Sequence, residues 1–166
     1  MSRETRTDAD VQSRQGERTN SLTRAAILAA IYAALTIALA PISYGPLQLR
    51  LAEAMTILPW LYPEAVPGLF LGCFIANLFG GYGVWDVVFG STATLAAAYL
   101  SSKVKNPWLA PLPPVLVNAI VIGAVLCVLE GLPFWLTAVQ VGLGQFGACY
   151  ILGMPLLFFL RRSPPL

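Results

Sequence analysis

Histidine is absent from this chain of 166 residues, and charged residues make up only 11% of it. Without histidine, imidazole acid–base catalysis, haem attachment and most zinc sites are excluded. The two lysines stand close together, and no G-x-x-x-x-G-K-[ST] motif is present to hold a nucleotide. The three cysteines form no C-x-x-C pair, so we expect small buried side chains at these positions and no cofactor.

The few charges are unevenly spread. Residues 1–24 contain nine of the 18 charged residues, and residues 25–160 contain only seven. A soluble domain carries about 25% charged residues. The net charge of +2 comes with no basic face for nucleic acid. We therefore exclude a soluble enzyme, a nucleic-acid binder and a disordered protein. Residues 1–20 are predicted to be a polar, disordered cytoplasmic tail, and residues 21–162 a single membrane domain.

The apolar stretches predict an all-α integral membrane protein with six transmembrane helices, because about 20 mostly apolar residues cross a bilayer. The expected spans are residues 22–41, 47–62, 65–80, 85–103, 110–129 and 133–160. The basic pairs Arg18 and Arg24, Lys103 and Lys105, and Arg161 and Arg162 then all fall on one side. The positive-inside rule assigns that side to the cytoplasm. We predict a multi-pass protein of the cell membrane with both termini cytoplasmic.

Polar residues gather near the outer ends of these spans. They are Arg50, Glu53, Asn77, Asp86 and Glu130, with Tyr44, Tyr82, Trp85, Phe134 and Trp135 close by. Ionisable residues inside a span are costly and are functional candidates by default. Carboxylates, an amide and flat rings together suit a small polar heteroaromatic ligand.

Structural explanations stay open for these residues. Arg50 and Glu53 stand three residues apart and could neutralise each other on one helix face. The aromatic side chains could form an ordinary interfacial belt. The amides of Asn118, Gln140 and Gln145 could join neighbouring helices by hydrogen bonds.

The first span carries two rows of alanine at four-residue spacing. One row is Ala25, Ala29 and Ala33, and the other is Ala26, Ala30 and Ala34. Small residues at this spacing let another helix approach closely. That helix could belong to this chain or to a partner subunit.

Three motifs in the polar spans point to a family. They are Gln48-x-Arg50-x-x-Glu53, Gly72-Cys73-x-x-Ala76-Asn77 and Asp86-x-x-x-Gly90-Ser91-x-x-Thr94. Together they resemble the QueT family over residues 20–162. Members of that family are substrate-binding (S) components of energy-coupling factor (ECF) transporters for queuosine precursors. The resemblance implies an S-component-like bundle, a membrane-embedded T subunit and two ATPase subunits as partners, and contact with the T subunit through the alanine face.

The resemblance also implies a 7-deazaguanine ligand such as preQ1, preQ0 or queuine. Glu53 or Asp86 would accept the two donors of its guanine-like edge, and Arg50 would orient Glu53. The remaining roles are hydrogen bonding by Asn77, Gln140 or Gln48, binding of an aminomethyl arm by Glu130, and stacking by Trp85 or Tyr82. No enzyme activity is predicted.

Other functions stay open. An S component for a different vitamin or nucleobase would share this fold, because fold alone does not fix a ligand. A facilitator that needs no partner would carry ligand across liposomes by itself. A membrane enzyme is disfavoured by the absence of histidine and by acidic residues scattered over different helices.

Overall fold

The computed structural model describes residues 3–44, 49–80 and 83–162, with side chains from Gln12 onward. Every regular element within these ranges is helical. The long α-helices are α1 (Arg3–Ala38), α3 (Ala65–Leu78), α5 (Ser91–Lys103), α6 (Leu112–Glu130) and α7 (Phe134–Phe146). The short ones are α2 (Ala40–Ser43), α4 (Gly83–Trp85) and α8 (Met154–Arg162). Four further segments are the 3-10 helices η1 (Leu51–Trp60) and η3 (Pro107–Leu109) and the π-helices η2 (Asp86–Gly90) and η4 (Gly147–Gly153).

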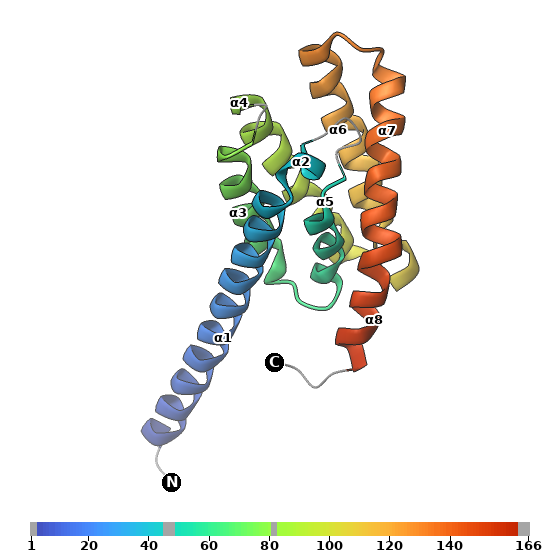
Figure 1. The fold of residues 1–166 in the computed structure, drawn as a ribbon. Helices are drawn as coiled ribbons and strands as arrows, with labels where there is room; N and C mark the ends of the chain where they lie inside the picture. Colours follow the sequence, from blue (N-terminus) through green and yellow to red (C-terminus); the bar gives the residue numbers. More distant parts are fainter. Residues whose placement is uncertain (1–2, 45–48, 81–82, 163–166) are drawn as a thin grey trace.

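The helices run roughly side by side around η1. Figure 1 shows the start of α1 and the end of α8 at the same end of the bundle, and the α6–α7 connection at the other. Gly131 makes that connection in a left-handed conformation with φ of 67°, which glycine adopts without strain. The segment from α7 through η4 to α8 is continuous and lies beside η1.

Helix α1 packs tightly on α3 because two glycines of α3 face it. A Cβ atom built on Gly68 would lie 2.5 Å from the carbonyl oxygen of Ala25, and one on Gly72 would lie 2.6 Å from that of Ala29. Ala25, Ala29 and Ala33 are buried in this contact. This alanine row therefore packs inside the chain, which is one of the two alternatives that the sequence left open.

The second predicted span, residues 47–62, differs from the expected α-helix. Within its described residues it forms η1, a 3-10 helix of 10 residues. At about 2 Å rise per residue it extends for roughly 20 Å, which is short of a 30 Å hydrocarbon core. Residues 52–59 are all buried, so η1 lies in the centre of the bundle, surrounded by other helices. Pro59 lacks an N–H group and so favours an interrupted helix here.

Three helical stretches are long and apolar enough to cross a membrane. They are Gln12–Ala38, Pro107–Glu130 and Phe134–Arg162, and α3 is a shorter apolar helix. These stretches agree with the predicted all-helical membrane protein, whereas the count of six spans stays a prediction.

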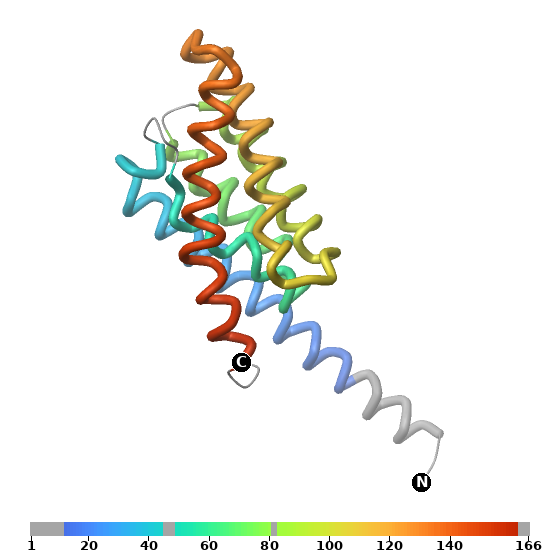
Figure 2. The backbone as a smooth tube through the Cα atoms, turned by 90° about the vertical axis from the view of Figure 1, so that its right-hand side faces the viewer, coloured from blue at the N-terminus to red at the C-terminus, as the bar shows by residue number. Residues whose placement is uncertain are grey.

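Helix α1 also extends beyond the predicted first span. It begins at Arg3, so it includes most of the segment expected to be a disordered tail. Residues 12–20 are exposed along this extension, and Figure 2 shows α1 leaving the bundle at its lower end. An apolar helix that is already formed can propagate into a polar segment, since elongation needs no new nucleus.

Candidate functional site

A buried ion pair stands near the end of the bundle where α1 and α3 finish. Nη2 of Arg50 donates to Oδ2 of Asp86 over 2.6 Å, and the two residues are 3% and 2% exposed. Arg50 lies in an extended conformation just before η1, and Asp86 opens the π-helix η2. The guanidinium therefore reaches across to η2 for this ion pair, whereas the spacing had left a contact with Glu53 open as one alternative.

Asn77 fixes the backbone on which Asp86 stands. Its Nδ2 donates to the main-chain oxygen of Asp86 over 2.8 Å, an oxygen that lies in the wide π-helical turn. Gly90 makes this close approach possible, since a Cβ atom there would lie 2.7 Å from Oδ1 of Asp86 and 2.8 Å from Nδ2 of Asn77. We call Arg50, Asn77, Asp86 and Gly90 the Asp86 half of the site.

Glu53 is surrounded by uncharged donors from three helices. The Tyr32 hydroxyl of α1 donates to its Oε1, as does the Thr94 hydroxyl of α5 over 3.3 Å. Nδ2 of Asn118 on α6 donates to Oε2 over 3.4 Å. Glu53 is only 1% exposed. We call Tyr32, Glu53, Thr94 and Asn118 the Glu53 half of the site.

The Cys73 thiol joins the two halves. Its Sγ accepts from Nδ2 of Asn77 over 3.4 Å and from the Thr94 hydroxyl over 3.3 Å, and Nη1 of Arg50 lies 3.9 Å away. A hydrogen-bonded network therefore runs from Asp86 to Glu53 through the middle of the bundle. Such networks hold a defined geometry when their members are paired.

Tyr44 closes this end of the network. The Cζ atom of Arg50 lies 5.1 Å from the centre of the Tyr44 ring, a distance typical of cation–π contact. The Tyr44 hydroxyl donates to the Ala76 carbonyl oxygen over 2.8 Å. Burial raises the pKa of Tyr44 to about 12, although the Arg50 charge opposes this. The hydroxyl therefore stays protonated at physiological pH.

Two buried polar atoms of the Asp86 half have no hydrogen-bond partner among the described residues. They are Nε of Arg50, which can donate, and Oδ1 of Asn77, which can accept. A buried polar atom left unpaired is costly. One unused donor and one unused acceptor in the same half of the site suit a ligand that offers both kinds of group.

Comparison with known proteins identifies a family. Residues 22–162 match the family described as QueT transporter. The chain belongs to the QueT transporter family. A relative from Lactococcus lactis subsp. cremoris (strain MG1363), the queuosine precursor transporter QueT, is 34% identical over 80 residues. The aligned part covers 47% of each chain, so the match spans about half the length of this curated relative. No solved structure matches the chain.

The structure of this QueT family member brings only some of the predicted site residues together. Arg50, Glu53, Asn77 and Asp86 lie in the network described above. Gln48 and Tyr82 fall outside the residues that the structure describes.

Three other predicted residues lie away from the network. Glu130 is exposed at the end of α6. Trp85 is 48% exposed and stacks on Phe89 at 5.6 Å between ring centres, and it lines a surface groove against α6. Gln140 on α7 is half-buried and belongs to neither half of the site. For Glu130 the position follows from the length of α6, whose far end extends with α7 beyond the other helices (Figure 1).

Four members of the network were not predicted from the sequence. They are Tyr32, Cys73 and Thr94, together with Asn118 in its role as a hydrogen-bond donor to Glu53. Tyr32 follows Ala29 and Ala30 and precedes Ala33 and Ala34 in the chain, where its neighbours gave no polar signal. Asn118 was interpreted only as an amide that joins helices, and it does make such a bond. Thr94 and Cys73 fall within the quoted family motifs, which could have drawn attention to them.

The second alanine row has a different environment from the first. Ala26, Ala30 and Ala34 are exposed. Ala26 and Ala30 line a shallow hollow of about 410 Å³ together with Leu22, Thr23 and Ile27. This row remains accessible for contact with another helix.

Proposed function

We propose that this chain is the membrane-embedded substrate-binding subunit of an ECF-type importer and captures a 7-deazaguanine precursor of queuosine. The family match and the name of the Lactococcus relative support the substrate class. The observation that carries the proposal is the buried Asp86 half, in which Arg50 Nε and Asn77 Oδ1 find no hydrogen-bond partner among the described residues and call for partners of opposite kinds.

The chemistry of a 7-deazaguanine matches those two atoms. Its ring carbonyl oxygen can accept from Nε of Arg50, and a ring N–H can donate to Oδ1 of Asn77. Its guanine-like edge presents adjacent N–H groups that a carboxylate accepts. Glu53 is the better candidate for that edge, since Asp86 is already engaged by Arg50. Within the described part of the chain, Oε2 of Glu53 accepts one long bond, from Asn118. The ring of Tyr44, rather than the exposed Trp85, lies where it could stack on a ligand beside Arg50.

Access to these buried atoms requires movement at the end of the bundle near Tyr44. The Tyr44 ring packs against Gly80, where a Cβ atom would lie 2.8 Å from the ring. We propose that this contact between the residues that follow α2 and those that follow α3 opens to admit the ligand and closes behind it.

The partners in this proposal are a membrane-embedded T subunit and two ATPases. The exposed row of Ala26, Ala30 and Ala34 is the surface proposed for the T subunit. Changing Ala30 to Leu fills the hollow and should reduce co-purification with such a complex while ligand affinity stays unchanged. Bulky residues along this row that leave association intact would place the docking face elsewhere.

We further propose six membrane crossings with both ends of the chain in the cytoplasm. Arg24 lies over the ring of Tyr62 at 5.5 Å, and Arg161 lies over the ring of Trp60 at 5.6 Å. Basic and aromatic residues paired in this way are typical of the membrane interface. Arg161 lies in the last turn of α8, and Arg24 and Tyr62 line one pocket together with Leu160 of the same helix. Figure 1 shows the end of α8 at the same end of the bundle as the start of α1.

Calorimetry on the purified chain in detergent tests the ligand. The panel is preQ1, preQ0, queuine, guanine, riboflavin and thiamine. We expect tight binding of one deazapurine and binding of guanine and the vitamins at least tenfold weaker. Tight binding of a vitamin alone would overturn the substrate class. Ligand flux into liposomes without any partner would favour the facilitator.

A further inference from the structure

Tyr32 connects the Glu53 half of the site to the helix that carries the exposed alanine row. We propose that the Tyr32 hydroxyl positions the Glu53 carboxylate and thereby links occupancy of the site to the packing of α1 on α3. The proposal rests on the proposed function, because it requires a ligand that engages Glu53. It makes Tyr32 a positioning residue, since the hydroxyl acts through Glu53.

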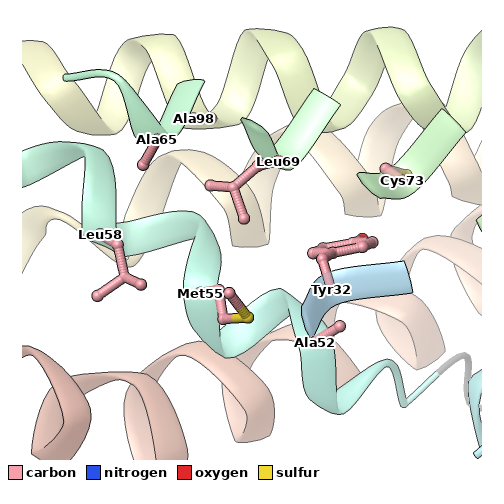
Figure 3. Packing of buried hydrophobic residues seen from close by; sticks show 8 residues of the cluster. All are labelled: Tyr32, Ala52, Met55, Leu58, Ala65, Leu69, Cys73 and Ala98. Carbon is pink, nitrogen blue, oxygen red and sulfur yellow. The ribbon is translucent and has the colours of Figure 1, made fainter. Parts of the chain in front are cut away.

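The contacts single out Tyr32 within α1. Its side chain is fully buried in a cluster with Ala52 of η1 and Leu69 and Cys73 of α3. Figure 3 shows the ring lying between Ala52 and Cys73. From there the hydroxyl reaches Oε1 of Glu53. A second buried hydroxyl of α1, that of Thr36, donates back to the main-chain oxygen of Tyr32 over 2.9 Å.

The backbone around Tyr32 has little room to adjust. A Cβ atom on Gly72 would lie 2.9 Å from Cβ of Tyr32 and 2.6 Å from the carbonyl oxygen of Ala29. The two helices therefore touch through backbone atoms at this level. Close-packed contacts of this kind shift as a unit rather than deform gradually. A change in the position of the Tyr32 ring is thus passed to α1 as a whole.

Ligand binding supplies a reason for the ring to change position. Oε1 of Glu53 already accepts from Tyr32 and from Thr94 at 3.3 Å. A ligand N–H that binds this carboxylate competes with those donors. A phenol hydroxyl displaced within this buried apolar cluster would be left unpaired, which is unfavourable. The competition between the ligand and Tyr32 for the Glu53 carboxylate therefore depends on the position of α1 relative to α3.

A movement of α1 also changes the surroundings of its exposed side, opposite Tyr32. Ala30 is exposed and precedes Tyr32 by two residues, so a shift of α1 changes its surroundings. A probe at Ala30 reports the seating of α1 without touching the site.

The experiment uses the full chain in lipid nanodiscs. The background protein carries Cys127→Ala, which removes the partly accessible native thiol, and Ala30→Cys, to which a bimane fluorophore is attached. The probe ligand is preQ1. We expect saturating preQ1 to shift the bimane emission in this background protein. Tyr32→Phe should abolish the shift and weaken binding less than tenfold, because Thr94 and Asn118 still hold Glu53.

Thr94→Ala is the matched control. It removes the other donor to the same oxygen, but from α5 instead of α1, so the emission shift should remain. A shift that survives in Tyr32→Phe, or that Thr94→Ala abolishes equally, overturns the inference. Binding of preQ1 without any shift in the background protein also overturns it while leaving the proposed function intact. Absence of binding to that protein overturns the proposed function itself.

Hydrogen exchange on the unmodified chain tests the same link without a variant. Saturating preQ1 should change exchange of the amides in residues 25–38 and leave those of residues 134–146 unchanged. Unchanged exchange in residues 25–38 would contradict the inference even if Tyr32→Phe failed to fold.

Discussion

The two halves of the site stabilise a buried carboxylate in different ways. Asp86 is paired with a single full charge, the guanidinium of Arg50 at 2.6 Å. Glu53 instead receives uncharged donors from Tyr32, Thr94 and Asn118. Removing one partner of a buried ion pair leaves the other charge uncompensated, whereas removing one of three neutral donors leaves the carboxylate partly solvated by the rest.

This difference suggests that the two halves have different roles in the site. The Asp86 half is held rigidly by its ion pair, by Asn77 and by the tight fit at Gly90. The Glu53 half can exchange one donor for another with little change in net charge. We therefore propose that the Asp86 half supplies a scaffold with fixed ligand contacts at Arg50 and Asn77, and that the Glu53 half supplies a ligand contact that can be exchanged for another donor.

Asp86→Asn provides the largest test of this contrast. It leaves the Arg50 guanidinium buried without its counter-charge, so the free energy of unfolding should fall by about 3–5 kcal/mol. Denaturant or thermal unfolding in detergent measures this loss. The double variant Arg50→Met with Asp86→Leu should recover most of the stability, because it removes both charges together, but it should not bind ligand. A single variant as stable as the natural chain would contradict the assignment of a scaffold role.

The residues of the Asp86 half could largely be found from sequence, since charged residues are rare enough in the apolar spans to stand out. The ion pair between Arg50 and Asp86 could not be predicted in this way. Arg50 and Glu53 share one short segment, and local spacing favours their contact, but η1 is not an α-helix. In its 3-10 geometry and with Arg50 extended before it, the guanidinium is free to reach η2.

The Glu53 half was harder to predict because its donors are ordinary residues in apolar helices. Tyr32 and Thr94 acquire their roles only when α1, α5 and η1 meet in three dimensions. The same limit applied to the alanine rows, where spacing predicts a close helix contact but does not say which row makes it. Gly68 and Gly72 on α3 decide that question in favour of Ala25 and Ala29.

Glu53→Gln should have a smaller effect on stability than Asp86→Asn. The amide keeps an acceptor for Tyr32 and Thr94 but turns a donor toward Nδ2 of Asn118, so about one hydrogen bond is lost. The expected cost is roughly 1–3 kcal/mol in unfolding free energy. Ligand affinity in calorimetry should fall more than tenfold, because the amide cannot accept two donors of a guanine-like edge. A stability loss larger than that of Asp86→Asn would reverse the division between the halves.

Gly72→Ala tests how far the Glu53 half depends on the seating of α1. The new methyl group would meet the Ala29 carbonyl oxygen and Cβ of Tyr32, so α1 must move outward. Overpacking of this kind costs about 1–3 kcal/mol. Gly142→Ala on α7 is a matched control, since its Cβ atom would lie at an ordinary 3.5 Å from Cβ of Ala119. That control should be neutral or stabilising by up to about 1 kcal/mol, as expected for alanine in a helix. Equal losses in both variants would mean that the α1–α3 contact is not special.

Glu130→Gln should have the smallest effect, although it removes one of the few acidic groups outside the tail. Glu130 ends α6 and is exposed, and it follows Asn118 by 12 residues on the same helix. At 1.5 Å rise per residue this places it about 18 Å along α6 from the contact with Glu53. An exposed substitution of this kind changes the unfolding free energy by less than about 0.5 kcal/mol. Affinity for preQ1, whose aminomethyl group would seek a carboxylate, should change less than twofold in calorimetry. A tenfold loss confined to preQ1, with preQ0 unaffected, would instead mean that the α6–α7 end folds over the site when ligand is bound, and would restore Glu130 to it.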